Sequence, residues 1–195
     1  MYSILLTIAR LLIRLLFRVK YLGKENMPNK GRVIVCCNHK SYLDAIFVAA
    51  PFKRQIHFMA MSELFENKLL SKFFYKMGAF PVKRGASDKR AIRYALEILN
   101  NENVLGIFPQ GKRVCKDIDF EPKEGISIIA VRSRSDILPI SIYYEGKLKL
   151  FKRITVRIGN IIKLDDLELN DSSKIKNVLT EEIKENILSL LEGKY

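Results

Sequence analysis

Acidic residues, histidines, cysteines and long apolar runs are all scarce in this sequence. Its 195 residues hold 21 aspartates and glutamates against 34 lysines and arginines, a net charge of +13. The three cysteines, two of them adjacent (Cys36 and Cys37), exclude a disulfide framework and favour a reducing compartment. No uncharged apolar run reaches the length of about 18 residues that a membrane-spanning helix needs. With only two histidines, a histidine-based mechanism has few candidates.

The composition indicates a single folded domain with a polyanionic partner. A chain of this length with 48% hydrophobic residues can bury a core without disulfides or metals, which excludes a disordered protein. The excess positive charge favours nucleic acid, an anionic membrane or a phosphorylated small molecule. Residues 1–24 hold five basic groups and no acid, whereas acids outnumber lysines eight to four from residue 164 onward. We therefore expect one basic face, with the C-terminus away from it.

The N-terminal segment, residues 1–22, predicts an amphipathic helix. Arg10, Arg14 and Arg18 are spaced by four and form one stripe, while apolar residues cover most of the remaining surface. A signal peptide carries its basic residues before the apolar run, and here they interrupt it. The pattern favours a helix in a membrane interface with its arginines at phosphate headgroups, and the alternative is an ordinary packing helix.

The remaining segment, residues 23–195, alternates strand and helix patterns, which predicts an α/β domain with a mixed, largely parallel sheet flanked by helices. The expected strands cover residues 33–37, 56–61, 79–82, 104–108, 138–143 and 150–158. The expected helices cover residues 41–50, 62–76, 87–99, 125–132 and 173–191, with Ser62 and Ser87 at two of the N-terminal ends.

His39 is the first candidate for chemistry, because it directly follows a buried strand, where ligands of open α/β sheets bind. If His39 lies in the loop and Asp44 in the first helical turn, the carboxylate can fold back onto the imidazole and leave one ring nitrogen free as a base. The alternative is that Ser41-x-x-Asp44 is only a helix capping box. We expect His57 to be structural and Cys37 to be a small buried hydrophobe rather than a nucleophile.

Two basic loops follow later strands. One reads Phe-Pro-Val-Lys-Arg-Gly over residues 80–85, and the other reads Phe-Pro-Gln-Gly-Lys-Arg over residues 108–113. Arginine at such a position can bind a phosphate with two hydrogen bonds, and glycine lets the backbone approach it. Taken singly, each loop is more often a solvated turn.

Taken in order, His39-x4-Asp44, the two basic loops and Leu138-Pro139-Ile140 resemble the 1-acylglycerol-3-phosphate acyltransferases, over about residues 33–142. The resemblance implies an enzyme of phospholipid synthesis that moves an acyl chain from acyl-CoA or acyl-carrier protein to lysophosphatidate. It implies residues 23–195 as the catalytic domain, on the cytoplasmic face of an anionic membrane, with no metal and no cofactor.

The same resemblance implies a role for each candidate residue. His39 is the general base and Asp44 its orienting partner. Arg84 and Arg113 contact the acceptor's phosphate, and the other expected substrate-binding residues are Lys83, Gln110, Gly111 and Lys112.

Two positions depart from the family pattern, whose third block usually reads Phe-Pro-Glu-Gly-Thr-Arg. Gln110 replaces the acid and Lys112 replaces the threonine, which makes the site more cationic. The alternatives are therefore the same chemistry on another lysolipid, an inactive relative that only binds lipid, and a basic nucleic-acid-binding module. Against the last, the sequence shows no aromatic-plus-basic RNA signature and no zinc spacing.

Overall fold

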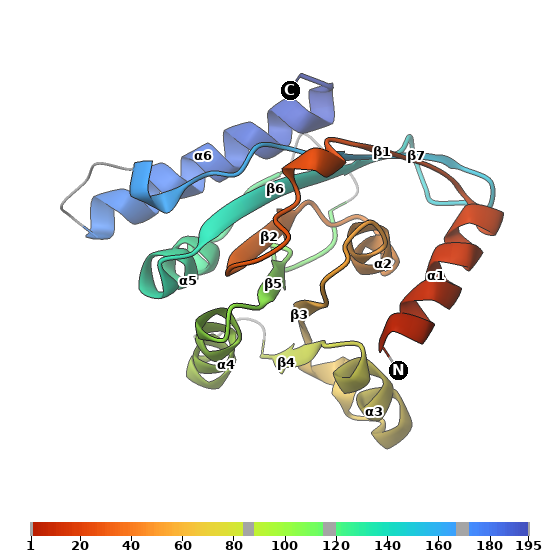
Figure 1. Ribbon diagram of the computed structural model, residues 1–195, viewed down its shortest axis with the longest axis horizontal. Helices are drawn as coiled ribbons and strands as arrows, with labels where there is room; N and C mark the ends of the chain where they lie inside the picture. Colours follow the sequence, from red (N-terminus) through yellow and green to blue (C-terminus); the bar gives the residue numbers. More distant parts are fainter. Residues whose placement is uncertain (1, 84–87, 115–119, 167–171, 195) are drawn as a thin grey trace.

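A seven-stranded mixed sheet organises the fold (Figure 1). The computed structural model describes residues 2–83, 88–114, 120–166 and 172–194. The strand order is β1-β7-β6-β2-β5-β3-β4, and every neighbouring pair is parallel except β6 with β7. The strands are β1 (Arg18–Leu22), β2 (Val33–Cys37), β3 (Ile56–Met61), β4 (Phe80–Val82), β5 (Val104–Ile107), β6 (Asp136–Tyr143) and β7 (Arg153–Ile158). The predicted α/β class with a largely parallel sheet is confirmed.

Helices cover both faces of this sheet, and each buries an apolar stripe against it. One face carries α1 (Tyr2–Leu16) and α2 (Asp44–Ala49). The other carries α4 (Lys89–Asn100), α5 (Gly125–Ser133) and α6 (Ser172–Glu192). The central strand β2 is buried along its whole length, as a β-branched run between two helical layers should be. Figure 1 shows α3 (Lys68–Lys76) beside β4, and α6 far from α1, which agrees with the expectation that the acidic C-terminus lies away from the basic N-terminus.

The N-terminal segment is not one helix to residue 22. α1 ends at Leu16, and Arg18–Leu22 forms β1, an edge strand that pairs in parallel with β7. The sequence did not predict this strand, because Arg18 continues the spacing of four set by Arg10 and Arg14, and only the pairing with β7 reveals the strand. The boundary at residue 22 therefore cuts through the sheet, and β1 belongs to the α/β domain.

α1 has three faces rather than two. Leu6 and Ile13 are buried against the domain, whereas Ile4, Leu11 and Leu15 are each about two-thirds exposed. Arg10 lies between these faces and donates from Nε to the carbonyl of Ala50 (2.6 Å) and from Nη2 to that of Phe52 (2.7 Å).

The prediction of an arginine stripe that faces solvent is therefore partly wrong. Arg10 binds backbone carbonyls just after α2 instead of pointing to solvent. No helix among the described residues is long and apolar enough to cross a membrane.

Other differences are local. The helix expected over residues 62–76 is divided into a short 3-10 turn (Ser62–Phe65) and α3, because Asn67 Oδ1 caps the backbone N–H groups of Leu69 and Leu70. Ser87, the expected cap of the next helix, lies outside the described residues. Asp88 caps α4 instead. The strand expected from residue 150 begins at residue 153, and α2 begins at residue 44 because a turn occupies residues 41–43.

Candidate active site

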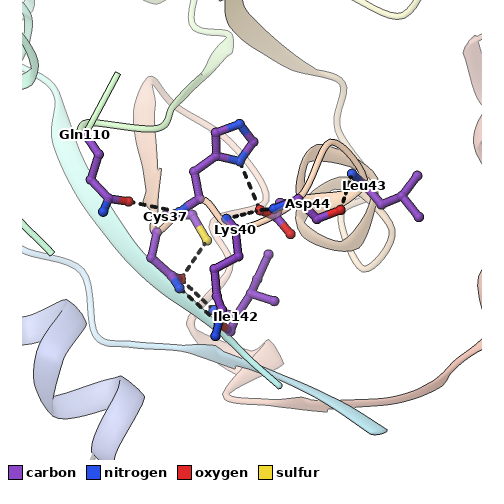
Figure 2. A network of polar contacts seen from close by, with 9 residues as sticks. Cys37, Lys40, Leu43, Asp44, Gln110 and Ile142 are labelled. Carbon is purple, nitrogen blue, oxygen red and sulfur yellow. Dashed lines mark hydrogen bonds and ion pairs between the residues drawn. The ribbon is translucent and has the colours of Figure 1, made fainter. Parts of the chain in front are cut away.

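The carboxyl end of β2 is fixed by a buried amide. Asn38 follows the strand directly and is 3% exposed. Its Oδ1 accepts from the backbone N–H of Ile142 (2.8 Å), and its Nδ2 donates to the Ile142 carbonyl (3.0 Å). The side chain therefore reproduces a strand-like pairing with β6. Figure 2 shows Ile142 within this network of polar contacts. Asn38 was not among the predicted site residues, although a polar residue directly after an apolar strand can indicate a residue that fixes the end of that strand.

His39 and Asp44 form the predicted pair. His39 Nδ1 lies 2.9 Å from Asp44 Oδ2, and the Asp44 side chain is fully buried while that of His39 is 13% exposed. His39 stands in the loop after β2 and Asp44 is the first residue of α2, so the carboxylate folds back onto the ring. With Nδ1 engaged, Nε2 is the ring nitrogen left to act as a base.

Asp44 also holds the turn that leads into its own helix. The same Oδ2 atom accepts from the backbone N–H groups of Lys40 (2.6 Å) and Ser41 (2.7 Å). The bond from Ser41 is half of the capping box that the sequence offered as the alternative. Ser41 Oγ accepts from the N–H of Leu43 (3.2 Å) rather than from that of Asp44. One carboxylate oxygen therefore makes both the contact with His39 and the backbone bond from Ser41 that belongs to a capping box.

An aromatic stack sets the plane of the His39 ring. The ring lies on Phe108 with a centroid distance of 4.1 Å and an interplanar angle of 17°. Phe108 in turn stacks on Phe58 of β3, at 5.6 Å and 11°. The imidazole is held by stacking on one side and by Asp44 at its Nδ1 edge, so its orientation is set before any substrate binds.

The loop after β5 supports the backbone of His39 from both sides. The N–H of His39 donates to Gln110 Oε1 (3.1 Å), and its carbonyl accepts from the N–H of Val114 (2.8 Å). Gln110 is 5% exposed, and its amide nitrogen has no hydrogen-bond partner within the described parts of the chain. The sequence analysis placed Gln110 in the substrate site. Its oxygen accepts from the backbone of the His39 loop, and a role of Gln110 in substrate binding stays a prediction.

Two of the expected cationic residues lie in the loop that contacts His39. Lys112 and Arg113 are exposed in the loop that binds His39, and the Arg113 guanidinium lies 3.6 Å above the ring centroid of Tyr42. Gly111 between them and Gln110 adopts a left-handed conformation with φ of 68°, which a residue with a side chain seldom adopts. Lys83 is exposed at the end of β4. Arg84 lies outside the described residues.

The structure supports the interpretation of the other nucleophile and base candidates as structural. Burial raises the pKa of the Cys37 thiol well above its ordinary value, and the nearby Asp44 charge acts in the same direction. Burial likewise lowers the pKa of His57, which lies within β3. Among the described residues, no group of three or more His, Cys, Asp or Glu side chains is arranged to hold a metal ion.

A histidine–carboxylate pair at the carboxyl edge of a mostly parallel sheet is the arrangement of an α/β enzyme that works by acid–base chemistry. The Acyltransferase family model matches residues 18–143, from β1 to the end of β6, and the chain belongs to this family.

Curated relatives and a solved structure agree with this family. The 1-acyl-sn-glycerol-3-phosphate acyltransferase of Bacillus subtilis is 28% identical over 202 residues, covering 97% of this chain and 96% of the relative. The enzyme of the same name from Streptococcus pneumoniae is 28% identical over 81% of this chain and 61% of its own length. The crystal structure of the 1-acyl-sn-glycerophosphate acyltransferase PlsC from Thermotoga maritima has the same fold, with a TM-score of 0.68, 21% identity, and coverage of 94% of this chain and 81% of that one.

The contact between Gln110 and His39 leads to a prediction about pH dependence. Gln110→Glu keeps an acceptor oxygen for the His39 N–H but adds a negative charge, which favours the protonated imidazole. The acidic limb of kcat/KM should therefore move to higher pH, by about one unit. Gln110→Ala leaves the N–H unpaired, and kcat should fall about 10-fold or more with little change in KM. The measurement is a pH profile of thiol release for both variants, and an unmoved limb in Gln110→Glu contradicts this account.

Proposed function

We propose that this chain transfers a fatty acyl group from an acyl thioester to the free hydroxyl of 1-acylglycerol 3-phosphate, giving phosphatidic acid. The single observation that carries the chemistry is the contact between His39 Nδ1 and the buried Asp44 carboxylate. The names of the curated relatives support the acceptor and the product.

In this mechanism, His39 Nε2 removes the proton from the acceptor hydroxyl as its oxygen attacks the thioester carbonyl. The tetrahedral intermediate collapses by breaking the carbon–sulfur bond, and the imidazolium returns the proton to the departing thiolate. The products are the ester and the free thiol, with no acyl-enzyme. General-base assistance of this kind contributes about 10²–10⁴ in rate. Asp44 contributes by accepting a hydrogen bond from the Nδ1–H group throughout and by stabilising the imidazolium.

The acceptor's phosphate is assigned to the cationic residues around the His39 loop. Arg113 belongs to the segment whose Gln110 and Val114 hold His39, which brings its guanidinium to the rim of the site. Stacking on Tyr42 limits the conformations of the guanidinium and leaves its edge N–H groups available to a phosphate. Lys112 adds a second positive charge next to it.

A second candidate is the same transfer to another lysolipid, because Gln110 and Lys112 replace the residues usual at these positions. The two candidates are separated by acceptor-dependent thiol release from an acyl thioester, with lysophosphatidate and lysophosphatidylcholine as acceptors. The proposal expects faster release with lysophosphatidate, since a cationic rim favours the acceptor of higher negative charge. A protein that acylates the choline lipid and ignores lysophosphatidate contradicts the assigned acceptor.

The catalytic pair is tested by substitution. His39→Ala and Asp44→Asn should each lower kcat by at least about 10²-fold, because one removes the base and the other its anionic partner. His57→Gln is the matched control, since it removes the other histidine at a site away from the chemistry. Thermal unfolding checks that each variant folds. Near-normal turnover in a folded His39→Ala protein excludes this mechanism.

Arg113 is tested through the acceptor's KM. Because Arg113 is exposed, its contact with phosphate is screened, and Arg113→Ala should cost about 1–2 kcal/mol, roughly 5- to 30-fold in acceptor KM. The KM of the acyl donor should stay unchanged. Arg90→Ala, which removes another exposed arginine, on α4, is the control. If Arg113→Ala instead raises only the KM of the acyl donor, Arg113 binds the phosphates of the donor's carrier group.

Membrane attachment is assigned to the exposed apolar face of α1. Ile4, Leu11 and Leu15 point to solvent on a helix whose opposite face is buried in the domain. Such a face beside arginines is typical of a helix in the plane of a membrane interface. Removal of the segment is a poor test, because it also removes Leu6 and Ile13 from the core.

A single substitution gives the cleaner measurement. Leu11→Ser should weaken binding to lipid vesicles, measured by sedimentation, about 10-fold, because less apolar area is buried in the interface. The thermal stability of the protein should stay unchanged, because Leu11 is exposed. Val178→Ser, a similar change at an exposed position of α6, is the control and should bind as the parent does. Equal vesicle binding by the two variants contradicts the assignment.

A further inference from the structure

A groove of about 1260 Å³ lies beside the edge strand β1, between α1 and the turn that follows α2. Its lining includes Ile13 of α1, Phe17 between α1 and β1, Val19 and Tyr21 of β1, and Pro51 of the turn. None of the residues that hold His39 lines it. The groove is therefore separate from the candidate active site.

The groove is strongly cationic. Of the lining residues in the described part of the chain, seven are cationic and none is acidic. The cations come from four separate parts of the chain: Arg10 and Arg14 of α1, Arg18 and Lys20 of β1 with Lys24 after it, Lys53 of the turn, and Arg153 of β7.

Most of these cations lack a protein partner. Arg10 is bound to backbone carbonyls, and Lys24 lies 5.3 Å from the ring centroid of Tyr21. Within the described residues, the side chains of the other five form no hydrogen bond and no ion pair. Arg18 and Arg153 are even direct neighbours in the β1–β7 register, where like charges repel. A bound anion would relieve the repulsion between these two arginines.

The floor of the groove adds no negative charge. Burial raises the pKa of Tyr21 to about 12, so its hydroxyl stays protonated. The hydroxyl donates to the carbonyl of Phe47 (3.2 Å), which also fixes α2 against β1.

Protection of a free sheet edge explains only part of this charge. Lysines and arginines on an edge strand prevent pairing with another chain, which accounts for Arg18 and Lys20. It does not account for Arg14 and Lys53, which lie on a helix and a turn that face the same groove. Convergence of cations from several elements on one hollow is what an anion-binding site requires.

We propose that this groove binds the headgroup phosphates of anionic phospholipids, at a site distinct from the one that holds the acceptor for reaction. The proposal rests on the proposed function, in which α1 lies in the membrane interface. The exposed apolar face of α1 adjoins the side that carries Arg10 and Arg14, so insertion of that face brings the groove to the depth of the headgroups. The site then orients the domain on an anionic surface while the reaction proceeds at His39.

The experiment compares two double variants that lose the same charge. Arg14→Ala with Lys53→Ala removes two groove cations, and Arg132→Ala with Lys174→Ala removes two exposed cations of α5 and α6. Sedimentation is measured with vesicles of phosphatidylcholine alone and with vesicles containing phosphatidylglycerol. Near an anionic surface each cation contributes about five-fold, so the groove variant should bind the anionic vesicles about 30-fold more weakly. The control should bind them nearly as the parent does, and all three proteins should bind phosphatidylcholine alike.

Three results overturn the proposal. Equal losses in both double variants indicate diffuse attraction to the net charge rather than a site. Unchanged vesicle binding with a loss of CoA binding in the groove variant assigns the groove to the soluble donor's phosphates. Loss of turnover on a short-chain acceptor dispersed without vesicles makes the groove part of the reaction site. Vesicle sedimentation requires no turnover, so it remains decisive even where the proposed acyl transfer fails.

Discussion

One carboxylate oxygen connects the backbone of this fold to its proposed chemistry. Asp44 Oδ2 accepts from His39 Nδ1 and from the backbone N–H groups of Lys40 and Ser41. The two backbone bonds shape the turn between β2 and α2, and the same turn delivers the carboxylate to the imidazole. Because Asp44 is fully buried, its charge is stabilised by these three donors rather than by water. The turn, the start of α2 and the contact with His39 therefore depend on the same acceptor atom.

The surroundings of this oxygen come from distant parts of the chain. Asn38 fixes the end of β2 against Ile142, while Gln110 and Phe108 hold the backbone and the ring of His39. The parallel order of β2, β5 and β6 brings these segments to one edge of the sheet. α2 separates this edge, where acyl transfer is proposed, from the cationic groove beside β1. Acyl transfer at the sheet edge and membrane binding at the groove, as proposed, suit a substrate that stays in a membrane.

Periodicity and short spacing predicted most of the fold and the central pair. Strand β3 was predicted with its observed bounds. The contact between His39 and Asp44 was predicted from their separation of five residues, and their roles were taken from the family resemblance. Contacts across the sheet were beyond such reasoning. The role of Gln110 depends on a hydrogen bond between residues 71 positions apart, and that of Arg10 on carbonyls 40 and 42 positions away. β1 was missed because its pairing with β7, not its own pattern, makes it a strand.

The most direct test of the proposed mechanism is the tautomer of neutral His39, measured by nitrogen NMR of protein labelled at its histidine rings. The chain has only two histidines, and the spectrum of a His57→Gln protein assigns both. The contact with Asp44 predicts a proton on Nδ1 and an unprotonated Nε2, the nitrogen that must accept the acceptor's proton. A neutral His39 that carries its proton on Nε2 contradicts the account, because the proposed base is then already occupied.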